Sequence, residues 1–206
     1  MKFYLIRHAK SISNDLNEWT GQRDVPLSQT GIDDQKEIAL KYSYPKGEIY
    51  FSSPQLRCTQ SLETIYGHGA DILLPDLLEC SMGILEGKKY DNLDSDPLYL
   101  SWINEPNKPI PNGESFNAFR TRSELAFEKM LALTVEKKIG SAVAMMHGNV
   151  MRAILHRFAD SSIEHNKWMI PNSGIYMLTV EEKTLRVNSW KTMPSFLFKT
   201  VEETKI

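Results

Sequence analysis

Two short apolar runs that each end in a histidine constrain the fold of this chain more than any other feature. The first, FYLI, covers residues 3–6 and is followed directly by Arg7 and His8. The second, AVAMM, covers residues 142–146 and is followed by His147. Short continuous apolar runs of this kind are typical of strands that are covered on both faces. We therefore expect two buried strands, each with a histidine at its carboxyl end.

Outside these runs, predicted strands and helices alternate along the chain, which is typical of an α/β layered domain. The other strands are predicted at residues 48–52, 71–74, 174–180 and 185–190. The helices are predicted at residues 28–42, 52–66, 115–138 and 150–158. Pro54 is expected in the first turn of its helix, where a missing N–H costs nothing. The pattern predicts a single α/β domain over residues 1–206.

Residues 82–113 interrupt this alternation. They contain Pro97, Pro106, Pro109 and Pro111, and this many prolines disfavours a long helix. We expect an insertion that folds over the strand ends as a lid, and a plain surface connection is the alternative. The insertion also carries aromatic side chains, namely Tyr90, Tyr99 and Trp102. These could stack on a base or a sugar of a substrate, or they could simply pack the insertion itself.

Charge and composition exclude several classes of protein. The net charge of −2 gives no basic excess, so neither nucleic acid nor a membrane surface is an expected partner. No apolar run approaches the length of a membrane span, and the apolar run near the first residue is too short for the core of a secretory signal. The two cysteines, Cys58 and Cys80, lack the spacing of metal ligands. We expect free thiols in a cytoplasmic protein.

The residues at the predicted strand ends point to phosphate binding. Ligands of open α/β sheets bind at the carboxyl ends of the strands, so His8 and His147 are expected at one edge. Arg57 lies in the first turn of a predicted helix and leans back toward the same edge. With Arg7 it offers planar donors that match phosphate oxygens, and helix N-termini add further donors. Each of these residues alone has an ordinary structural explanation, so the prediction depends on their convergence, which would bind a phosphoryl group without a metal.

The same cluster suggests a chemical step. Two nearby arginines are expected to lower the pKa of His8, which keeps its imidazole neutral and able to attack phosphorus. A phosphohistidine would form, and the departing alkoxide would take a proton from a carboxylic acid held close by. Spacing alone leaves Glu79, Glu86 and Glu114 open for this acid role.

At these residues the chain resembles the histidine phosphatase superfamily, also called the phosphoglycerate-mutase-like family. The resemblance runs from residue 3 to about residue 178 and includes six motifs in the family's order. They are LIRHAKSISN, GQRDVPLSQTG, FSSPQLRCTQS, LLECSMGILEG, PNGES and MMHGN. The resemblance implies a three-layer α/β/α sandwich around a mostly parallel central sheet.

The resemblance also implies a role for each motif residue. His8 is the nucleophile, and Glu79 donates a proton to the leaving group and later activates water. The residues that hold the phosphoryl oxygens are Arg7, Arg57 and His147. The further substrate-binding residues are Asn14, Gly21, Gly148 and Asn149. No cofactor and no metal are implied. The chain departs from the family pattern at Ala9 and Asn149, where glycine is frequent.

The motifs favour a phosphatase over a mutase. Met82 stands where the mutase motif has tyrosine, and residues 82–113 contain no arginine to bind a second anionic group. We expect a histidine acid-type phosphatase, a phosphoric monoester hydrolase that acts on a small phosphorylated metabolite and that could form a homodimer. The alternatives are a cofactor-dependent phosphoglycerate mutase and a catalytically silent module that binds phosphate or a partner.

Overall fold

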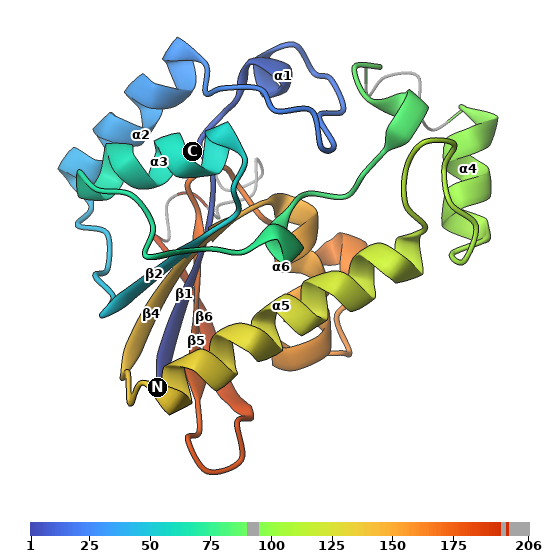
Figure 1. The fold of residues 1–206 in the computed structure, drawn as a ribbon. Coiled ribbons are helices and arrows are strands. Elements are labelled where there is room, and N and C mark those ends of the chain that lie inside the picture. The colour runs from blue at the N-terminus through green and yellow to red at the C-terminus, as the bar shows by residue number, and fades with distance from the viewer. Residues whose placement is uncertain (90–94, 195–196, 198–206) are drawn as a thin grey trace, which may run out of the picture.

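The computed structural model describes residues 1–89, 95–194 and 197. Over these residues it has one six-stranded sheet with helices on both faces, which confirms the α/β fold class (Figure 1). The strand order is β3-β2-β4-β1-β5-β6. The strands are β1 (Lys2–Arg7), β2 (Ile49–Ser52), β3 (Ile72–Leu73), β4 (Ser141–Met146), β5 (Ile175–Val180) and β6 (Val187–Met193).

Most of the sheet is parallel. β1 pairs in parallel with β4, β4 pairs in parallel with β2, and β2 pairs in parallel with β3. β5 runs antiparallel to β1 and β6 antiparallel to β5, and these two strands form the other edge of the sheet. Because β1, β2 and β4 point the same way, their carboxyl ends lie at one edge of the sheet. His8, Ser53 and His147 follow these strands and are therefore brought together, as the sequence predicts for the two histidines.

Helices form the outer layers. α2 and α3 cover one face of the sheet, α5 and α6 cover the other, and α1 and α4 lie beyond these layers (Figure 1). The bounds are α1 (Ile12–Asp15), α2 (Gln29–Lys41), α3 (Leu56–Tyr66), α4 (Pro97–Asn104), α5 (Phe116–Glu136) and α6 (Gly148–Ile154), with a π-helical turn over Leu155–Ala159. Serine side chains cap the two longest helices, because Ser28 accepts from the Gly31 amide and Ser115 from the Ala118 amide.

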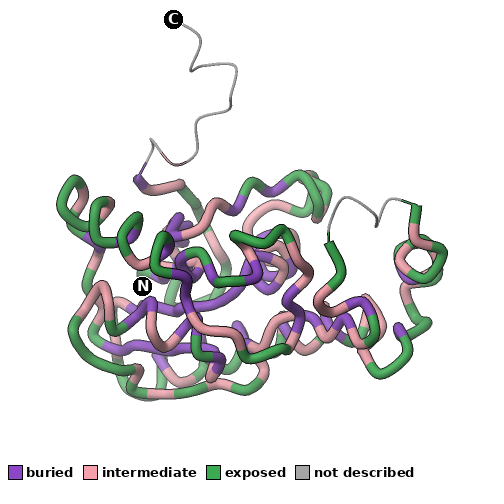
Figure 2. Tube along the Cα trace, turned by 90° about the horizontal axis from the view of Figure 1, so that it is seen from above, coloured by how far each residue is buried: buried purple, intermediate pink, exposed green. Residues whose placement is uncertain are grey.

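The sheet separates two apolar clusters, and alternate residues of each strand face one or the other. On the side of α5 and α6, Phe3 and Leu5 pack with Phe127. On the side of α3, Ile6 packs with Leu62. Figure 2 shows the buried segments running through the middle of the molecule, with exposed residues on the outer helices. This burial on both faces explains why the first strand reads as a continuous apolar run.

The expected position of Pro54 was wrong. α3 begins at Leu56 with Gln55 as its N-cap, so Pro54 lies before the helix. The residue before a proline is restricted to extended backbone. Ser53 accordingly continues the sheet, and its amide donates to the Met145 carbonyl at 3.0 Å. Arg57 still falls in the first turn of α3, so its predicted direction is unaffected.

The prolines in residues 82–113 allow a short helix, with Pro97 as its first residue and Pro106 two residues beyond its last. α4 starts at Pro97, whose missing N–H is tolerated there, and the Asp96 side chain accepts from the next two amides. Tyr90 lies outside the described residues. The movement of this segment as a lid stays a prediction, as does the division of the chain into domains. None of the helices described is long and apolar enough to cross a membrane.

Candidate active site

A cavity of about 270 Å³ lies at the edge where β1, β2 and β4 end. All but one of the predicted site residues line it, and they are Arg7, His8, Asn14, Gly21, Arg57, Glu79, Gly148 and Asn149. The exception, His147, lies directly behind, with its ring centroid 5.2 Å from that of His8. The structure therefore brings the predicted residues together, although they come from five distant segments of the chain.

His8 is held as a neutral imidazole with one lone pair available. Its Nδ1 lies 2.6 Å from the Ala9 carbonyl oxygen. A carbonyl only accepts, so Nδ1 carries the hydrogen and Nε2 keeps its lone pair. Burial is the main reason that the pKa of His8 lies well below its usual value, and Arg57 and Arg7 lower it further. The sequence predicted the effect of the arginines but not the larger effect of burial.

Arg57 is fixed before any ligand binds. Its side chain is 1% exposed. Its Nη2 donates to the Gly21 carbonyl at 2.9 Å, and its Nη1 donates to the Arg23 carbonyl at 3.0 Å. Its Nε donates to His147 Nδ1 at 3.2 Å. Such a preorganised guanidinium can stabilise negative charge without reorganising during the reaction.

His147 is also neutral. Since Arg57 donates to Nδ1, the ring hydrogen is on Nε2, which lies 2.9 Å from Ser53 Oγ. Burial, followed by the charge of Arg57, places its pKa well below the usual value. Both ring nitrogens thus have protein partners, so His147 orients Arg57 in this arrangement. Its direct contact with a phosphoryl oxygen stays a prediction.

Of the three glutamates that spacing left open for the acid role, Glu79 is the one that lines the cavity. Its Oε1 accepts from the Cys80 amide at 2.8 Å and its Oε2 from the Asn149 amide at 3.4 Å. Glu86 instead accepts from the Gln22 and Met82 amides. Glu114 accepts from the Ser81 amide and from Arg122. The geometry therefore places Glu79 where a substrate's leaving oxygen could reach it.

The family model of the histidine phosphatase superfamily (branch 1) matches residues 3–193. The chain belongs to this superfamily. The resemblance found in the six motifs is thus confirmed, and the superfamily's mostly parallel sheet agrees with the topology described above.

Curated relatives in the superfamily carry both phosphatase and mutase names. "Putative phosphoserine phosphatase 2" of Hydrogenobacter thermophilus is 28% identical over 87% of this chain and 90% of its own length. The 2,3-bisphosphoglycerate-dependent phosphoglycerate mutase of Pseudoalteromonas atlantica is 27% identical over 73% of this chain and 81% of its own. The crystal structure of the alpha-ribazole phosphatase from Shigella flexneri matches with a TM-score of 0.73 at 21% identity, covering 91% of this chain and 95% of that one, and supports the shared fold.

Sequence reasoning missed Trp19 and Arg152, which also line the cavity. Arg152 Nη1 donates to Asn149 Oδ1 at 3.0 Å, and its Nε donates to the Trp168 carbonyl at 3.1 Å. A signal was present, because Arg152 follows Gly148 by four residues and so shares its face of α6. Arg152 adds a cation that is not part of the superfamily motifs considered above.

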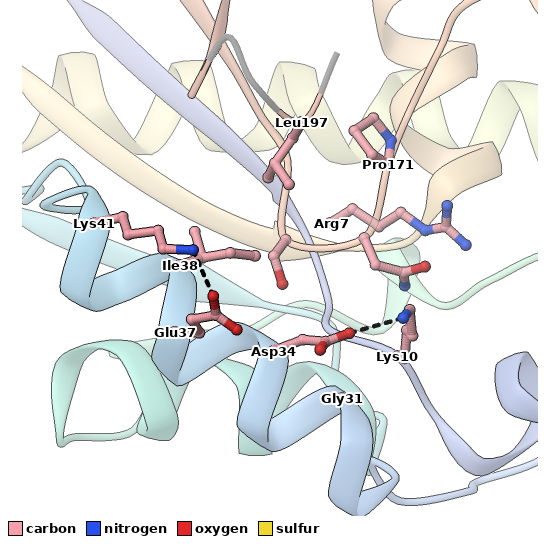
Figure 3. A pocket seen from close by; sticks show the side chains of 11 residues that line it. Arg7, Lys10, Gly31, Asp34, Glu37, Ile38, Lys41, Pro171 and Leu197 are labelled. Carbon is pink, nitrogen blue, oxygen red and sulfur yellow. Dashed lines mark hydrogen bonds and ion pairs between the residues drawn. The ribbon is translucent and has the colours of Figure 1, made fainter. Parts of the chain in front are cut away.

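A larger cavity, of about 490 Å³, lies on the other side of Arg7 and is less suited to phosphate (Figure 3). Its wall on α2 carries Asp34 and Glu37, whose carboxylates pair with Lys10 and Lys41. The Arg7 guanidinium points away from these carboxylates in Figure 3. Size therefore does not identify the site, and the chemistry favours the smaller cavity.

Gly21 acts on the site through Arg57. It has φ +52°, and a Cβ there would lie 2.1 Å from Glu86 Oε1. Gly67 also has positive φ, at +74°, but a Cβ there would meet nothing within 4 Å. Gly67→Ala is expected to lower the free energy of unfolding by about 1–2 kcal/mol for the left-handed backbone alone. Gly21→Ala should lower it further and should also weaken binding of inorganic phosphate at the cavity, because the carbonyl that holds Arg57 must move.

Urea unfolding and titration with inorganic phosphate on the two glycine variants measure these effects. Equal stability losses with unchanged phosphate binding in both variants would contradict this role of Gly21.

His8 and His147 are expected to stay neutral when the solution is made mildly acidic. Because both pKa values are lowered, neither ring should gain a proton as the pH passes through about 6.5, where an ordinary histidine titrates. The lowered pKa values also affect stability. In acid the unfolded chain binds more protons than the folded chain, so the free energy of unfolding should decrease as the pH falls below about 6.5. Ring ¹⁵N shifts in NMR, assigned with His8→Ala, test this, and a titration of either ring near pH 6.5 would refute it.

Proposed function

We propose that this chain is a histidine acid-type phosphatase that hydrolyses the phosphate monoester of a small metabolite through a phosphohistidine at His8, without a metal ion. The observation that carries the proposal is the state of His8. Its ring is neutral, its Nδ1 is fixed on the Ala9 carbonyl, and it lies at the cavity beside two guanidiniums. A lone pair next to positive charge is what attack on a phosphoryl dianion requires.

In the first step, His8 Nε2 attacks phosphorus and the bond from phosphorus to the ester oxygen breaks. Arg7 and Arg57 take up the negative charge on the phosphoryl oxygens, with the Gly148 amide and Asn14 as further donors. The side-chain Oδ1 of Asn14 accepts from the Ser11 amide at 3.0 Å. That bond leaves the amide nitrogen as the Asn14 group that can donate to phosphate. Glu79 gives its proton to the departing alkoxide.

In the second step, Glu79 takes a proton from water, and the resulting hydroxide oxygen attacks the phosphohistidine. Inorganic phosphate leaves and His8 returns to its neutral form, so protons and charges balance over the cycle. The two steps assign His8 and Glu79 to chemistry and the cationic groups to binding.

A phosphoglycerate mutase is the second candidate, and Arg152 is the observation in its favour, because it could bind the carboxylate that such substrates carry. Two lysines in residues 82–113 give a mutase less support, because each is paired with a carboxylate. Lys88 pairs with Asp96 and Lys108 pairs with Glu105. Met82, where the mutase motif has tyrosine, lines the cavity and is 1% exposed. We therefore favour hydrolysis.

Phosphate release from p-nitrophenyl phosphate in excess EDTA tests the proposed reaction. The rate is expected to equal the rate without chelator, because the arginines neutralise the phosphate, and vanadate should inhibit by mimicking five-coordinate phosphorus. Loss of activity in EDTA that Mg²⁺ restores would contradict a metal-free reaction. Conversion of 3-phosphoglycerate in the presence of 2,3-bisphosphoglycerate, without phosphate release, would favour the mutase.

A further inference from the structure

A second chamber adjoins the phosphate cavity. It has a volume of about 390 Å³, within the range of small-molecule sites. Trp19, Asn149 and Arg152 line both spaces. A molecule whose phosphate lies at His8 can therefore extend past these residues into the chamber, which we call the aromatic chamber.

Aromatic rings form much of the wall of this chamber, and they come from three separate elements. Tyr99 and Trp102 lie on α4, Phe116 begins α5, and Trp19 follows α1. Figure 1 shows α4 beside the N-terminal end of α5, away from the sheet. The Tyr99 ring is near-parallel to that of Trp102, with centroids 6.2 Å apart, and lies 5.4 Å from that of Trp19. The Trp102 ring meets Phe116 edge-on at 5.4 Å.

The wall is also held in place. Trp102 is 8% exposed, and its indole N–H donates to the Glu114 carbonyl at 2.9 Å. Glu114 in turn accepts from Arg122 and the Ser81 amide, which ties α4 to the segment that carries Glu79. Rings that are already ordered lose little entropy when another ring packs against them. The aromatic side chains thus pack the insertion and line a space at the same time.

Charge changes along the path from one space to the other. The phosphate end has Arg7 and Arg57, and the junction has Arg152 held by Asn149. Beyond the junction, the described lining contains no carboxylate, and its one imidazole is that of His165. Burial, with the charge of Arg152, lowers the pKa of His165 to about 4, so this ring is neutral at pH 7. The far end of the chamber is therefore uncharged.

We propose that the substrate is a phosphate ester whose alcohol portion ends in a flat, uncharged ring that occupies the aromatic chamber. An oxygen-bearing spacer lies beside Arg152 and Asn149, and the phosphate lies at His8. A nucleoside 5′-monophosphate has these three parts in this order. The proposal rests on the proposed function and narrows its substrate class. Three-carbon acids such as phosphoserine and phosphoglycerate end at the junction and leave the chamber empty.

The contribution of the ring is measured by comparing each of the four ribonucleoside 5′-monophosphates with ribose 5-phosphate. The ester bond and the spacer are of the same kind in all five compounds, so the ratio of kcat/KM isolates the ring. At least one nucleotide is expected to exceed ribose 5-phosphate by about tenfold or more, since stacking on aromatic side chains adds to binding. If none of the four exceeds it by more than about twofold, the proposal is wrong.

Two neighbouring residues of α4 provide a variant and its control. Tyr99→Ala is expected to reduce the nucleotide-to-ribose ratio below about twofold, and Tyr99→Phe to retain it, because the ring supplies the contact. Leu100 is 41% exposed and does not line the chamber. Leu100→Ala should leave the ratio and both rates as they are in the wild type. A ratio that survives Tyr99→Ala would overturn the assignment of the chamber.

A binding measurement separates this proposal from the proposed reaction. His8→Ala protein is titrated with the same five compounds, and the quenching of tryptophan fluorescence is followed. If no ester is hydrolysed by the wild type, the proposed reaction fails. The chamber is still supported if a nucleotide binds more tightly than ribose 5-phosphate and this difference is lost in the double variant His8→Ala with Tyr99→Ala. Equal binding, or no binding, of all five compounds overturns it.

Discussion

His8→Ala is expected to reduce the kcat for p-nitrophenyl phosphate by at least about 10⁴-fold, measured as nitrophenolate release in excess EDTA. The reason is that His8 supplies the lone pair that forms the new bond to phosphorus, and the ring of His147 cannot substitute for it. Both nitrogens of His147 are engaged, one by Arg57 and one by Ser53. Without the nucleophile, the pocket can only bind phosphate and orient water.

His68→Ala is the matched control for this substitution. His68 is exposed, lies at the end of α3 and does not line the phosphate cavity. Its replacement should leave kcat and KM at their wild-type values. Circular dichroism of both variants shows whether the fold is retained. A folded His8→Ala protein with more than about a tenth of the wild-type rate would contradict the role of His8 as nucleophile.

Glu79→Gln should separate proton donation from binding. On an alkyl phosphate such as glycerol phosphate, the rate of phosphohistidine formation should fall by about 10²–10⁴-fold, because the amide cannot protonate an alkoxide. On p-nitrophenyl phosphate the loss in this step should be small, since nitrophenolate leaves without a proton. Rapid-quench measurement of the first turnover isolates this step from the later attack by water, in which Glu79 also takes part.

Glu86→Gln is the comparison for the acid role. Glu86 is the nearby carboxylate that accepts from two backbone amides and does not line the cavity. Any loss that it causes should be equal for the two esters, because it acts on the position of the loop that holds Gly21. Equal losses for the two esters in Glu79→Gln would contradict its assignment as the proton donor.

The meeting of His8 and His147 could be predicted because it depends on a local signal. Each follows a short apolar run, and parallel strands place their carboxyl ends at one edge. Helix α5 was predictable for a similar reason, since residues 115–138 have apolar residues three and four apart. The start of α3 was predicted four residues too early, at residue 52 instead of Leu56, because Pro54 reads equally well as a first-turn residue and as the end of an extended segment.

The position of Glu79 at the cavity could not be predicted from spacing, since it depends on contacts that are distant in sequence. Arg122, on α5, donates to the carbonyls of Asp76 and Leu78, both at 2.8 Å, and to that of Glu79 at 3.3 Å. These bonds fix the segment that presents Glu79 to the cavity. The superfamily motif identified this glutamate, whereas no local pattern distinguishes it from Glu86.

The tautomers of the two histidines also could not be predicted from the sequence. They follow from the Ala9 carbonyl at His8 and from Arg57 at His147, and the second contact joins residues 90 positions apart. The aromatic chamber likewise depends on how α4 packs against α5, which no spacing in residues 82–113 reveals. The lid movement, a homodimer, the absence of nucleic-acid partners and a cytoplasmic location stay predictions.

Detection of phosphate on His8 tests the central claim most directly. Wild-type and Glu79→Gln proteins are mixed with p-nitrophenyl phosphate, which phosphorylates both, quenched in alkali, which preserves phosphohistidine, and digested for mass spectrometry. We expect an acid-labile phosphoryl group on the peptide that contains His8, present in wild type and enriched in Glu79→Gln, where attack by water is slowed. Substrate turnover with no phosphoryl group on His8, or with the group on another residue, would contradict it.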